Sequence, residues 1–278
     1  MTEIAVLLTV HNRKEKTEAC LYRLYQCELP SDVTLVTYLT DDGCTDGTAD
    51  MLAEKYPQVK VVQGDGNLFW NRGMHKAWQR AVEERDFDFY LWLNDDTYLY
   101  KETIKNMLAD AAEKNNEAII TGATRSADTG KTTYGLRNPK TEEPITPNGT
   151  LQTGTGLNGN CVLVPRKVYQ QLGNLDPYFH HAAGDTDYGL RAQEQGIDVL
   201  LAKNYVGECE WHPTLSTWCN PDYSLRERWK SLNKPTGMPL KQLFYLERKH
   251  YGLPRALFHL CTTVAHCCFP KLWLKLDL

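Results

Sequence analysis

The sequence lacks several patterns that mark well-known classes of protein. It has nine cysteines but no Cys-x-x-Cys pair, which argues against a disulfide framework or a zinc knuckle and is typical of a reducing cytosol. No basic stretch precedes the apolar residues 1–10, so we expect a buried strand there and no signal peptide. No internal repeat and no low-complexity tract is present.

Glycine is missing where many nucleotide-binding folds carry it. Thr9–Lys14, which follow the first expected strand, contain no glycine. A nicotinamide-dependent dehydrogenase would have a Gly-x-Gly-x-x-Gly loop there, and a nucleotidyltransferase would have a Gly-rich opening loop. A haloacid-type phosphatase needs paired aspartates on its first strand, whereas the acidic pairs of this chain follow later strands. These three classes are therefore excluded.

What is present indicates an α/β fold. The 278 residues are 42% hydrophobic and 24% charged, which is ordinary for a soluble globular protein. Residues 1–125 alternate short apolar runs with amphipathic stretches, the pattern of βαβ units and a parallel sheet, whereas residues 125–158 predict loops and a hairpin. Strands are expected at Ile4–Thr9, Thr34–Thr40, Val59–Gln63, Phe89–Leu93, Ala118–Gly122 and Cys161–Pro165, and helices at Glu15–Cys27, Thr45–Tyr56, Asn71–Glu84, Lys101–Lys114, from Arg166 and around Asp187–Gln195.

The C-terminal part differs electrically from the rest. Arg226–Leu278 has ten Lys or Arg and three acidic residues, so the net charge of −4 leaves −11 for residues 1–225. From Leu253 apolar side chains recur at helical spacing, but the opposite face is too regularly polar for a transmembrane span. We expect a basic, amphipathic helical extension over 226–278. It lies either on an anionic membrane surface or against the catalytic domain or a partner, and the acidic remainder excludes nucleic acid as a partner.

Two acidic motifs follow expected strands. Asn94-Asp95-Asp96 comes directly after a buried strand, and alternation along an extended chain points Asn94 and Asp96 one way and Asp95 the other. Ligands bind at this edge of open α/β sheets, where a carboxylate can hold Mg²⁺ or Mn²⁺ against a diphosphate. The pair Asp41-Asp42 closes another strand, where a carboxylate can accept the imide N–H of uracil or thymine. Either motif alone also fits a capped turn.

Five elements, in this order, resemble the family 2 glycosyltransferases of the GT-A fold. They are Val6–Arg13, Asp41–Thr48, Asn94-Asp95-Asp96 in the place of the Asp-x-Asp motif, Gly159–Arg166 with Leu175–Phe179, and Gly184–Arg191. The resemblance spans residues 4 to about 212. It implies a Rossmann-like, mostly parallel sheet flanked by helices, with a catalytic domain over 1–225 that has a nucleotide-binding half in 1–125 and an acceptor-side half in 126–225.

The resemblance also implies roles for the matching residues. Asp42 or Asp41 would accept the base N–H, and Asp96 would bind the metal, with His212 completing its shell. Trp70 would either form part of the wall of the donor-sugar site or pack under the sheet. The nucleotide site would comprise Thr9, His11, Arg13, Asp41, Asp42, Asn67, Arg72, Asn94 and Asp95.

Asp185 is the expected catalytic base on the acceptor side. One carboxylate suffices to take the proton of the acceptor hydroxyl if a metal neutralises the departing diphosphate, and such direct displacement inverts the anomeric centre. Gly159 and Asn160 would contact a sugar. Asp187 would do the same or pair with Arg191 at i+4. The sequence departs from the family at position 184, where glycine replaces the usual glutamate, and at Asn94 and Cys44.

These features predict an inverting, metal-dependent glycosyltransferase. Its donor is expected to be a UDP- or dTDP-sugar, its cofactor Mn²⁺ or Mg²⁺, and its acceptor a glycan or lipid-linked glycan in bacterial surface polysaccharide or glycoconjugate synthesis. The expected location is cytoplasmic, peripheral at the inner face of the cell membrane, and the oligomeric state stays open. The alternative is a catalytically inactive nucleotide-sugar-binding module, which would bind donor yet release no nucleoside diphosphate.

Overall fold

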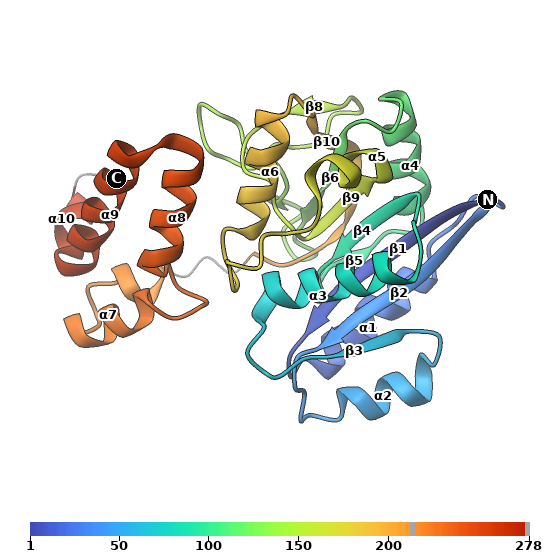
Figure 1. The fold of residues 1–278 in the computed structure, drawn as a ribbon, viewed down its shortest axis with the longest axis horizontal. Helices are drawn as coiled ribbons and strands as arrows, with labels where there is room; N and C mark the ends of the chain where they lie inside the picture. Colours follow the sequence, from blue (N-terminus) through green and yellow to red (C-terminus); the bar gives the residue numbers. More distant parts are fainter. Residues whose placement is uncertain (212–214, 276–278) are drawn as a thin grey trace.

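A single twisted sheet organises the computed structural model, which describes residues 1–211 and 215–275 (Figure 1). Its strand order is β3-β2-β1-β4-β9-β6-β10-β5, with β7 paired to β6 and β8 paired to β10. Strands β1 to β4 run parallel, as do β6 and β10, whereas β9 lies antiparallel between β4 and β6. The predicted, mostly parallel sheet is confirmed. The strands are β1 (Thr2–Val10), β2 (Val33–Asp41), β3 (Lys60–Gln63), β4 (Phe89–Leu93), β5 (Tyr98–Leu99), β6 (Ile119–Arg125), β7 (Thr132–Tyr134), β8 (Gln152–Thr153), β9 (Cys161–Pro165) and β10 (Val199–Glu208).

Helices cover both faces of the sheet. Alternate side chains of β1 belong to two different cores: Ile4, Val6 and Leu8 pack with residues of α1, α2 and α4, and Ala5 and Leu7 pack with α3 and α6. This is the result expected for a strand buried on both faces, which reads as a continuous apolar run. The helices are α1 (Lys14–Tyr25), α2 (Thr48–Lys55), α3 (Phe69–Glu84), α4 (Thr103–Glu113), α5 (Arg166–Leu172), α6 (Gly184–Glu194), η1 (Thr217–Cys219), α7 (Leu225–Leu232), α8 (Leu240–Tyr251), α9 (Leu253–Cys268) and α10 (Pro270–Lys275).

One helix begins later than predicted for an identifiable reason. The helix expected from Thr45 begins at Thr48, because Gly47 before it has a left-handed φ of 84° and Asp46 bonds the backbone of the turn. Its carboxylate accepts the N–H groups of Thr48 (3.1 Å) and Lys14 (2.8 Å). Asp46 therefore joins the loop after β2 to the start of α1, and both flank the carboxyl edge of the sheet.

The C-terminal extension, described as far as residue 275, contains the four helices α7 to α10 beside α6, at the opposite end of the molecule from the N-terminus (Figure 1). Helix α7 begins at a capping box in which Ser224 and Glu227 satisfy each other's backbone N–H, so the expected boundary at 225/226 falls within its first turn. Pro270 separates α9 from α10, as its missing N–H requires. Among the described residues, none of the helices combines the length and the apolar character needed to cross a membrane.

A buried charged network fixes α8 to α6. Asp187 is fully buried and accepts hydrogen bonds from Arg191 Nε (2.8 Å) and Lys249 Nζ (2.6 Å), and His250 Nε2 lies 2.9 Å from it. Lys249 also reaches Asp176 at 3.1 Å. A buried carboxylate needs such compensation. The extension thus packs on α6 and on the turn that carries Asp176 through charged groups.

Candidate functional site

A cavity of about 430 Å³ opens at the carboxyl edge of β1, β2 and β4, and we call it the strand-edge cavity. The edge gathers residues from segments far apart in the sequence because the parallel strands all end there. Most of the predicted nucleotide residues lie on its wall. Its lining includes Thr9, His11, Arg13, Asp42, Phe69, Trp70, Asn94, Asp95, Asp96, Tyr134, Asn160, His181, Cys209 and Thr236.

Arg13 joins the two carboxylates of the acidic motif. Its guanidinium lies 2.9 Å from Asp95 Oδ1 and also contacts Asp96 Oδ2. Burial raises the pKa of Asp95 to about 7, against the opposing effect of Arg13, whereas Asp96 is partly exposed to the cavity. Alternation along the chain was expected to point Asp95 and Asp96 in opposite directions, but both carboxylates contact the Arg13 guanidinium.

A divalent cation fits this pair only in part. Asp95 Oδ2 is buried and has no hydrogen-bond partner, so it is an unused oxygen ligand of the kind that hard cations prefer. Within residues 1–211 and 215–275, however, no group of three or more His, Cys, Asp or Glu is placed to hold a metal. Burial raises the pKa of Cys209 on the same wall to about 12, so this side chain stays a thiol. The predicted ligand His212 lies outside the described residues.

The amide of Asn94 matches its two neighbours. Its Oδ1 accepts from Trp70 Nε1 at 2.7 Å, and its Nδ2 donates to Asn160 Oδ1 at 2.7 Å. A carboxylate could accept but not donate, so asparagine in the first position of the motif suits this wall. Gly159 leaves room for the indole, because a Cβ there would lie 2.3 Å from the Trp70 ring.

The carboxylate of Asp42 organises the loop that walls the cavity. It is 3% exposed and accepts the backbone N–H groups of Gly66 (2.8 Å), Leu68 (3.0 Å) and Phe69 (3.0 Å). Phe69 begins α3 with a φ of 56°, which is strained for an aromatic residue and is commonest at functional sites. His11, whose Nδ1 lies 2.6 Å from the Asp42 carbonyl oxygen, is exposed beside this loop.

The structure does not bring four of the predicted residues to a cavity. Asp41 accepts the N–H of Cys44 at 2.8 Å, and Asn67 bonds only within its own turn, to Asp65. Arg72 donates to the Pro177 carbonyl at 2.8 Å. Asp187 is held in the network with α8. None of the four lines the strand-edge cavity or the cavity described next.

A second cavity of about 580 Å³ lies beside the N-terminus of α6, and we call it the helix cavity. Trp70, Asn94, Asn160 and His181 line both cavities, so the two adjoin. The remaining lining comes from the segment before β9, the turn before α6, the first turn of α6 and the C-terminal extension. These residues are Asn158, Gly159, Ala182, Ala183, Asp185, Thr186, Met238, Leu243, Leu246 and Glu247.

Asp185, the expected base, lies in the first turn of α6 on the wall of the helix cavity. Its Oδ2 accepts the N–H of Gly159 at 3.2 Å, and its Oδ1 accepts the N–H of Thr186 at 2.8 Å. Burial raises its pKa despite these bonds. A carboxylate with a raised pKa, held by backbone donors, is suited to accept a proton.

The glycine at position 184 has a local cause. A Cβ at Gly184 would lie 1.7 Å from Asn71 Oδ1. The Asn71 amide is fixed because its Nδ2 donates to the carbonyls of Asp176 (2.8 Å) and Phe179 (2.9 Å). No residue with a side chain fits at position 184 while Asn71 holds this turn.

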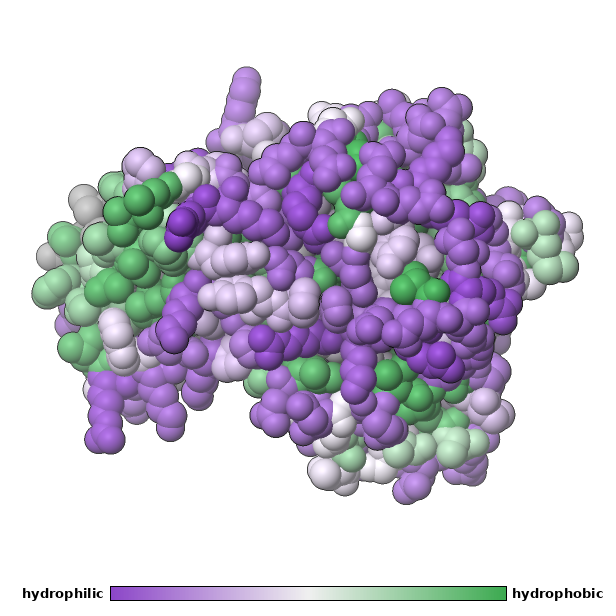
Figure 2. Space-filling model, viewed as in Figure 1, coloured by the Kyte–Doolittle hydropathy of each residue, from purple (hydrophilic) through white to green (hydrophobic). Residues whose placement is uncertain are grey.

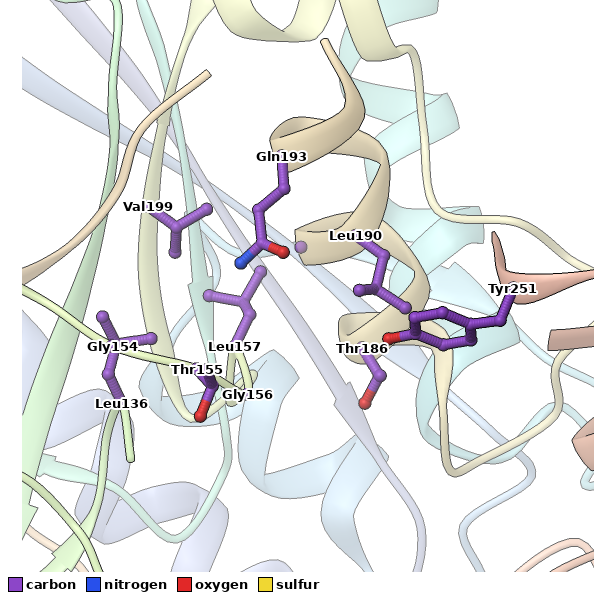
Figure 3. Close-up of a pocket in the computed structure, with 11 residues that line it drawn as sticks. Leu136, Gly154, Thr155, Gly156, Leu157, Thr186, Leu190, Gln193, Val199 and Tyr251 are labelled. Atoms are coloured by element: carbon purple, nitrogen blue, oxygen red, sulfur yellow. The ribbon is translucent and has the colours of Figure 1, made fainter. Parts of the chain in front are cut away.

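A third, smaller cavity of about 180 Å³ lies on another side of α6 (Figure 3). Leu157 and Leu190 form much of its wall, the amide of Gln193 points into it, and the Tyr251 hydroxyl points toward it from the extension. Thr186 lines this cavity and the helix cavity. Thus the first turn of α6 is surrounded by cavities to which the extension also contributes.

Sequence reasoning missed several lining residues. Thr236, Leu243, Leu246 and Glu247 come from the extension, and Tyr134 comes from β7 in the irregular segment. None of them stands in a motif, and each reaches a cavity through long-range packing. No signal in the sequence singles out Glu247, which stands between Leu246 and the basic run Arg248-Lys249-His250.

Comparisons with known proteins agree with this geometry. The sequence pattern of Glycosyl transferase family 2 matches residues 5–173. The low-salt glycan biosynthesis hexosyltransferase Agl10 of Haloferax volcanii is 22% identical over 172 residues, which are 56% of this chain and 50% of that protein. An N-acetylglucosaminyl-diphospho-decaprenol L-rhamnosyltransferase of Mycobacterium tuberculosis is 22% identical over 223 residues, 69% of this chain and 72% of that protein. The chain thus spans about half the length of the first relative.

Solved structures share the fold. S. aureus TarS 1–349 in complex with UDP-GlcNAc has a TM-score of 0.60 at 13% identity, over 97% of this chain and 72% of that chain. The mannosyltransferase PcManGT from Pyrobaculum calidifontis, in complex with GDP-Man and Mn²⁺, has a TM-score of 0.55 at 16% identity, over 99% and 79%. The expected α/β architecture of GT-A type is confirmed. Since the family pattern covers more than half of the sequence, from β1 to the end of α5, this chain belongs to glycosyl transferase family 2.

Proposed function

We propose that this chain transfers a sugar from a UDP- or dTDP-sugar to an acceptor hydroxyl with inversion at the anomeric carbon. The supporting observation is that the strand-edge and helix cavities share a wall of Trp70, Asn94 and Asn160. A donor sugar held at this wall lies next to an acceptor that enters beside Asp185. A pure nucleotide-binding module has no need of the second cavity or of a buried carboxylate in it.

In the proposed reaction Asp185 takes the proton of the acceptor hydroxyl while the hydroxyl oxygen attacks the anomeric carbon. The bond between that carbon and the diphosphate oxygen breaks, and its electron pair leaves with the nucleoside diphosphate. Because attack and departure are on opposite sides, the configuration inverts. The N–H groups of Gly159 and Thr186 orient the carboxylate, and its raised pKa makes it a stronger base than an exposed aspartate.

We assign the diphosphate to the end of the strand-edge cavity that holds Arg13, Asp95 and Asp96. Mn²⁺ or Mg²⁺, when bound by Asp96 with Asp95 assisting, would neutralise charge on the leaving diphosphate. Arg13 already brings positive charge to these carboxylates. His11 and Thr9 would border the base and ribose, and Asp42 would support this wall through the loop that it holds.

A donor panel tests the proposal. UDP-, dTDP- and GDP-sugars would each be incubated with the protein, and release of nucleoside diphosphate without acceptor measured in Mn²⁺, Mg²⁺ or EDTA. We expect slow hydrolysis of a UDP- or dTDP-sugar that falls at least about tenfold in EDTA, because loss of a Lewis acid removes several kcal/mol of charge stabilisation. Binding of a donor without any release of diphosphate, even with acceptors present, would favour the inactive module.

For the acceptor we propose a lipid-linked glycan at the cytoplasmic face of the membrane. The mycobacterial relative is named for a diphospho-decaprenol acceptor, and the helix cavity has an apolar wall from Met238, Leu243 and Leu246. We further propose that residues 1–225 are the catalytic domain and that 226–278 complete its acceptor side.

The extension also presents an exposed apolar face that we propose lies on an anionic membrane surface (Figure 2). Helix α9 exposes Leu257 (48%) and Phe258 (63%), and Phe269, between α9 and α10, is 65% exposed. Exposed cations at Arg248 and Lys271 belong to the same extension. Apolar side chains beside cations are the features that attract a helix to anionic lipid.

Vesicle flotation tests this membrane contact. The protein is expected to float with vesicles that contain phosphatidylglycerol and not with neutral vesicles, and Phe258→Asp should lower the bound fraction about tenfold, because a charge replaces a buried apolar contact. Tyr22→Asp is the control, since Tyr22 is 59% exposed on α1, away from the extension. Equal flotation of the two variants would contradict the proposal.

A further inference from the structure

The helix cavity has one charged residue that no sequence motif explains. Asp185 and Glu247 are its acidic lining residues among those the structure describes, and they come from different parts of the chain, α6 and α8. Glu247 is 7% exposed. Its neighbours along the wall are the apolar Leu243 and Leu246 of the same helix. A carboxylate in such surroundings is costly unless it has partners and a use.

Glu247 is held by α9. Its Oε1 lies 2.8 Å from His259 Nδ1, and its Oε2 accepts from Arg255 Nε at 3.1 Å. These bonds fix the carboxylate without exhausting it, because two carboxylate oxygens offer about four acceptor positions. The oxygens can therefore still accept hydrogen bonds from hydroxyl groups in the cavity.

The position of Glu247 is also fixed relative to the expected base. Lys249 and His250, within one turn of it on α8, both bond Asp187, which lies two residues after Asp185 on α6. The network thus ties the two carboxylate-bearing helices together. A change in the distance between α6 and α8 would break these buried ion pairs, which is strongly unfavourable.

Position 184 cannot supply this second carboxylate. A Cβ there would overlap the Asn71 amide at 1.7 Å, so the turn before Asp185 carries no acidic partner at that position. We propose that Glu247 is the acceptor-binding carboxylate of this enzyme and that its acceptor is a sugar joined to an apolar aglycone. Glu247 accepts a hydrogen bond from a hydroxyl next to the attacking one, and Leu243 contacts the aglycone.

This inference rests on the proposed glycosyl transfer, so its test begins with the donor that the hydrolysis panel identifies. The probes are n-octyl and methyl glycosides of common hexoses and N-acetylhexosamines, and the readout is transfer of the donor sugar. The wild-type protein is expected to use at least one octyl glycoside, with a KM about tenfold below that of the methyl glycoside, because several methylene groups become buried. Donor hydrolysis without transfer to any octyl glycoside would overturn the acceptor class but leave donor use intact.

Two variants separate binding from structure. Glu247→Gln should raise the KM for the octyl glycoside about tenfold or more, the effect of losing a charge-assisted hydrogen bond, with a smaller change in kcat and no change in the KM for donor. Arg255→Gln is the matched control, because it breaks the same α8–α9 ion pair from a position that does not line the helix cavity. An equal rise in acceptor KM in both variants would show a structural role for Glu247 and overturn the assignment.

Leu243→Ser tests the aglycone separately. Leu243 is half-buried on the cavity wall, so a serine is tolerated there better than at the buried Leu246. The variant should lose most of the preference for the octyl over the methyl glycoside. An unchanged preference would remove Leu243 from the aglycone site.

Discussion

Replacing Asp185 by asparagine is expected to lower kcat for sugar transfer about 10²- to 10⁴-fold, the range that a general base contributes. Asparagine keeps the size of the side chain, but its single amide oxygen can accept only one of the two N–H groups, of Gly159 and Thr186, that the carboxylate oxygens accept. The first turn of α6 should persist because its backbone bond from the Asp187 N–H to the Ala183 carbonyl (2.8 Å) is unchanged. It cannot take the proton of the acceptor hydroxyl. The measurement is steady-state transfer at saturating donor, with the donor affinity determined in parallel.

The pH dependence of the transfer rate offers a second test of Asp185 as the base. Burial raises the pKa of Asp185 above that of an exposed aspartate, and the base acts only when it is deprotonated. The rate of the wild-type enzyme should therefore fall on acidification through this raised pKa, earlier than an exposed aspartate would allow. The Asp185→Asn variant should lack this limb. A variant with a near wild-type rate and the same acidic limb would remove Asp185 from the mechanism.

Sequence reasoning located the strand-edge cavity well because its residues follow strands. Apolar runs such as Phe89–Leu93 identify buried strands, and parallel strands bring their carboxyl ends to one edge. Thr9, His11, Arg13 and Asp96 therefore meet on one wall although more than 80 residues separate the first from the last. For these residues, position along the chain predicts position in space.

The same reasoning could not assign bonds within a loop. Asp42 stands where a base contact is expected, but backbone N–H groups from residues 66, 68 and 69 bond its carboxylate. Arg72 lies in a helix that approaches the cavity, yet its side chain turns to the Pro177 carbonyl. Both outcomes depend on the backbone conformation of a turn. The residue types alone are compatible with several such conformations, each with different hydrogen-bond partners.

The acceptor side was the least predictable part. Glu247 is 62 positions from Asp185 and stands in a basic, amphipathic segment, which fitted a membrane surface as well as packing on the catalytic domain or a partner. The charge count identified a basic segment that includes α8. It could not show that Lys249 and His250 of this helix contact the buried Asp187. When long-range ion pairs position a helix, the sequence of that helix does not indicate which of its residues line a cavity.

Replacing Gly184 by alanine is the second large expected effect, and it should destabilise the protein. In an ordinary helix this change stabilises by about 1 kcal/mol. Here the added Cβ would lie 1.7 Å from Asn71 Oδ1 and 2.4 Å from its Cγ, so the amide must leave its place. Overpacking of about 1–3 kcal/mol and the loss of two hydrogen bonds to the Asp176 and Phe179 carbonyls, about 1 kcal/mol each, would together lower the free energy of unfolding by roughly 3 kcal/mol or more.

Urea denaturation measures this effect, and a second substitution identifies its cause. In an Asn71→Gly background the three atoms that the new Cβ would meet are absent, so Gly184→Ala should there cost little or become stabilising. The difference between the two backgrounds is the interaction energy between positions 71 and 184. If alanine at 184 destabilised both backgrounds equally, the clash with Asn71 would not be the reason for glycine. If it does so only beside Asn71, this turn of α6 excludes the glutamate usual in the family, and a carboxylate of the acceptor site must come from elsewhere in the fold.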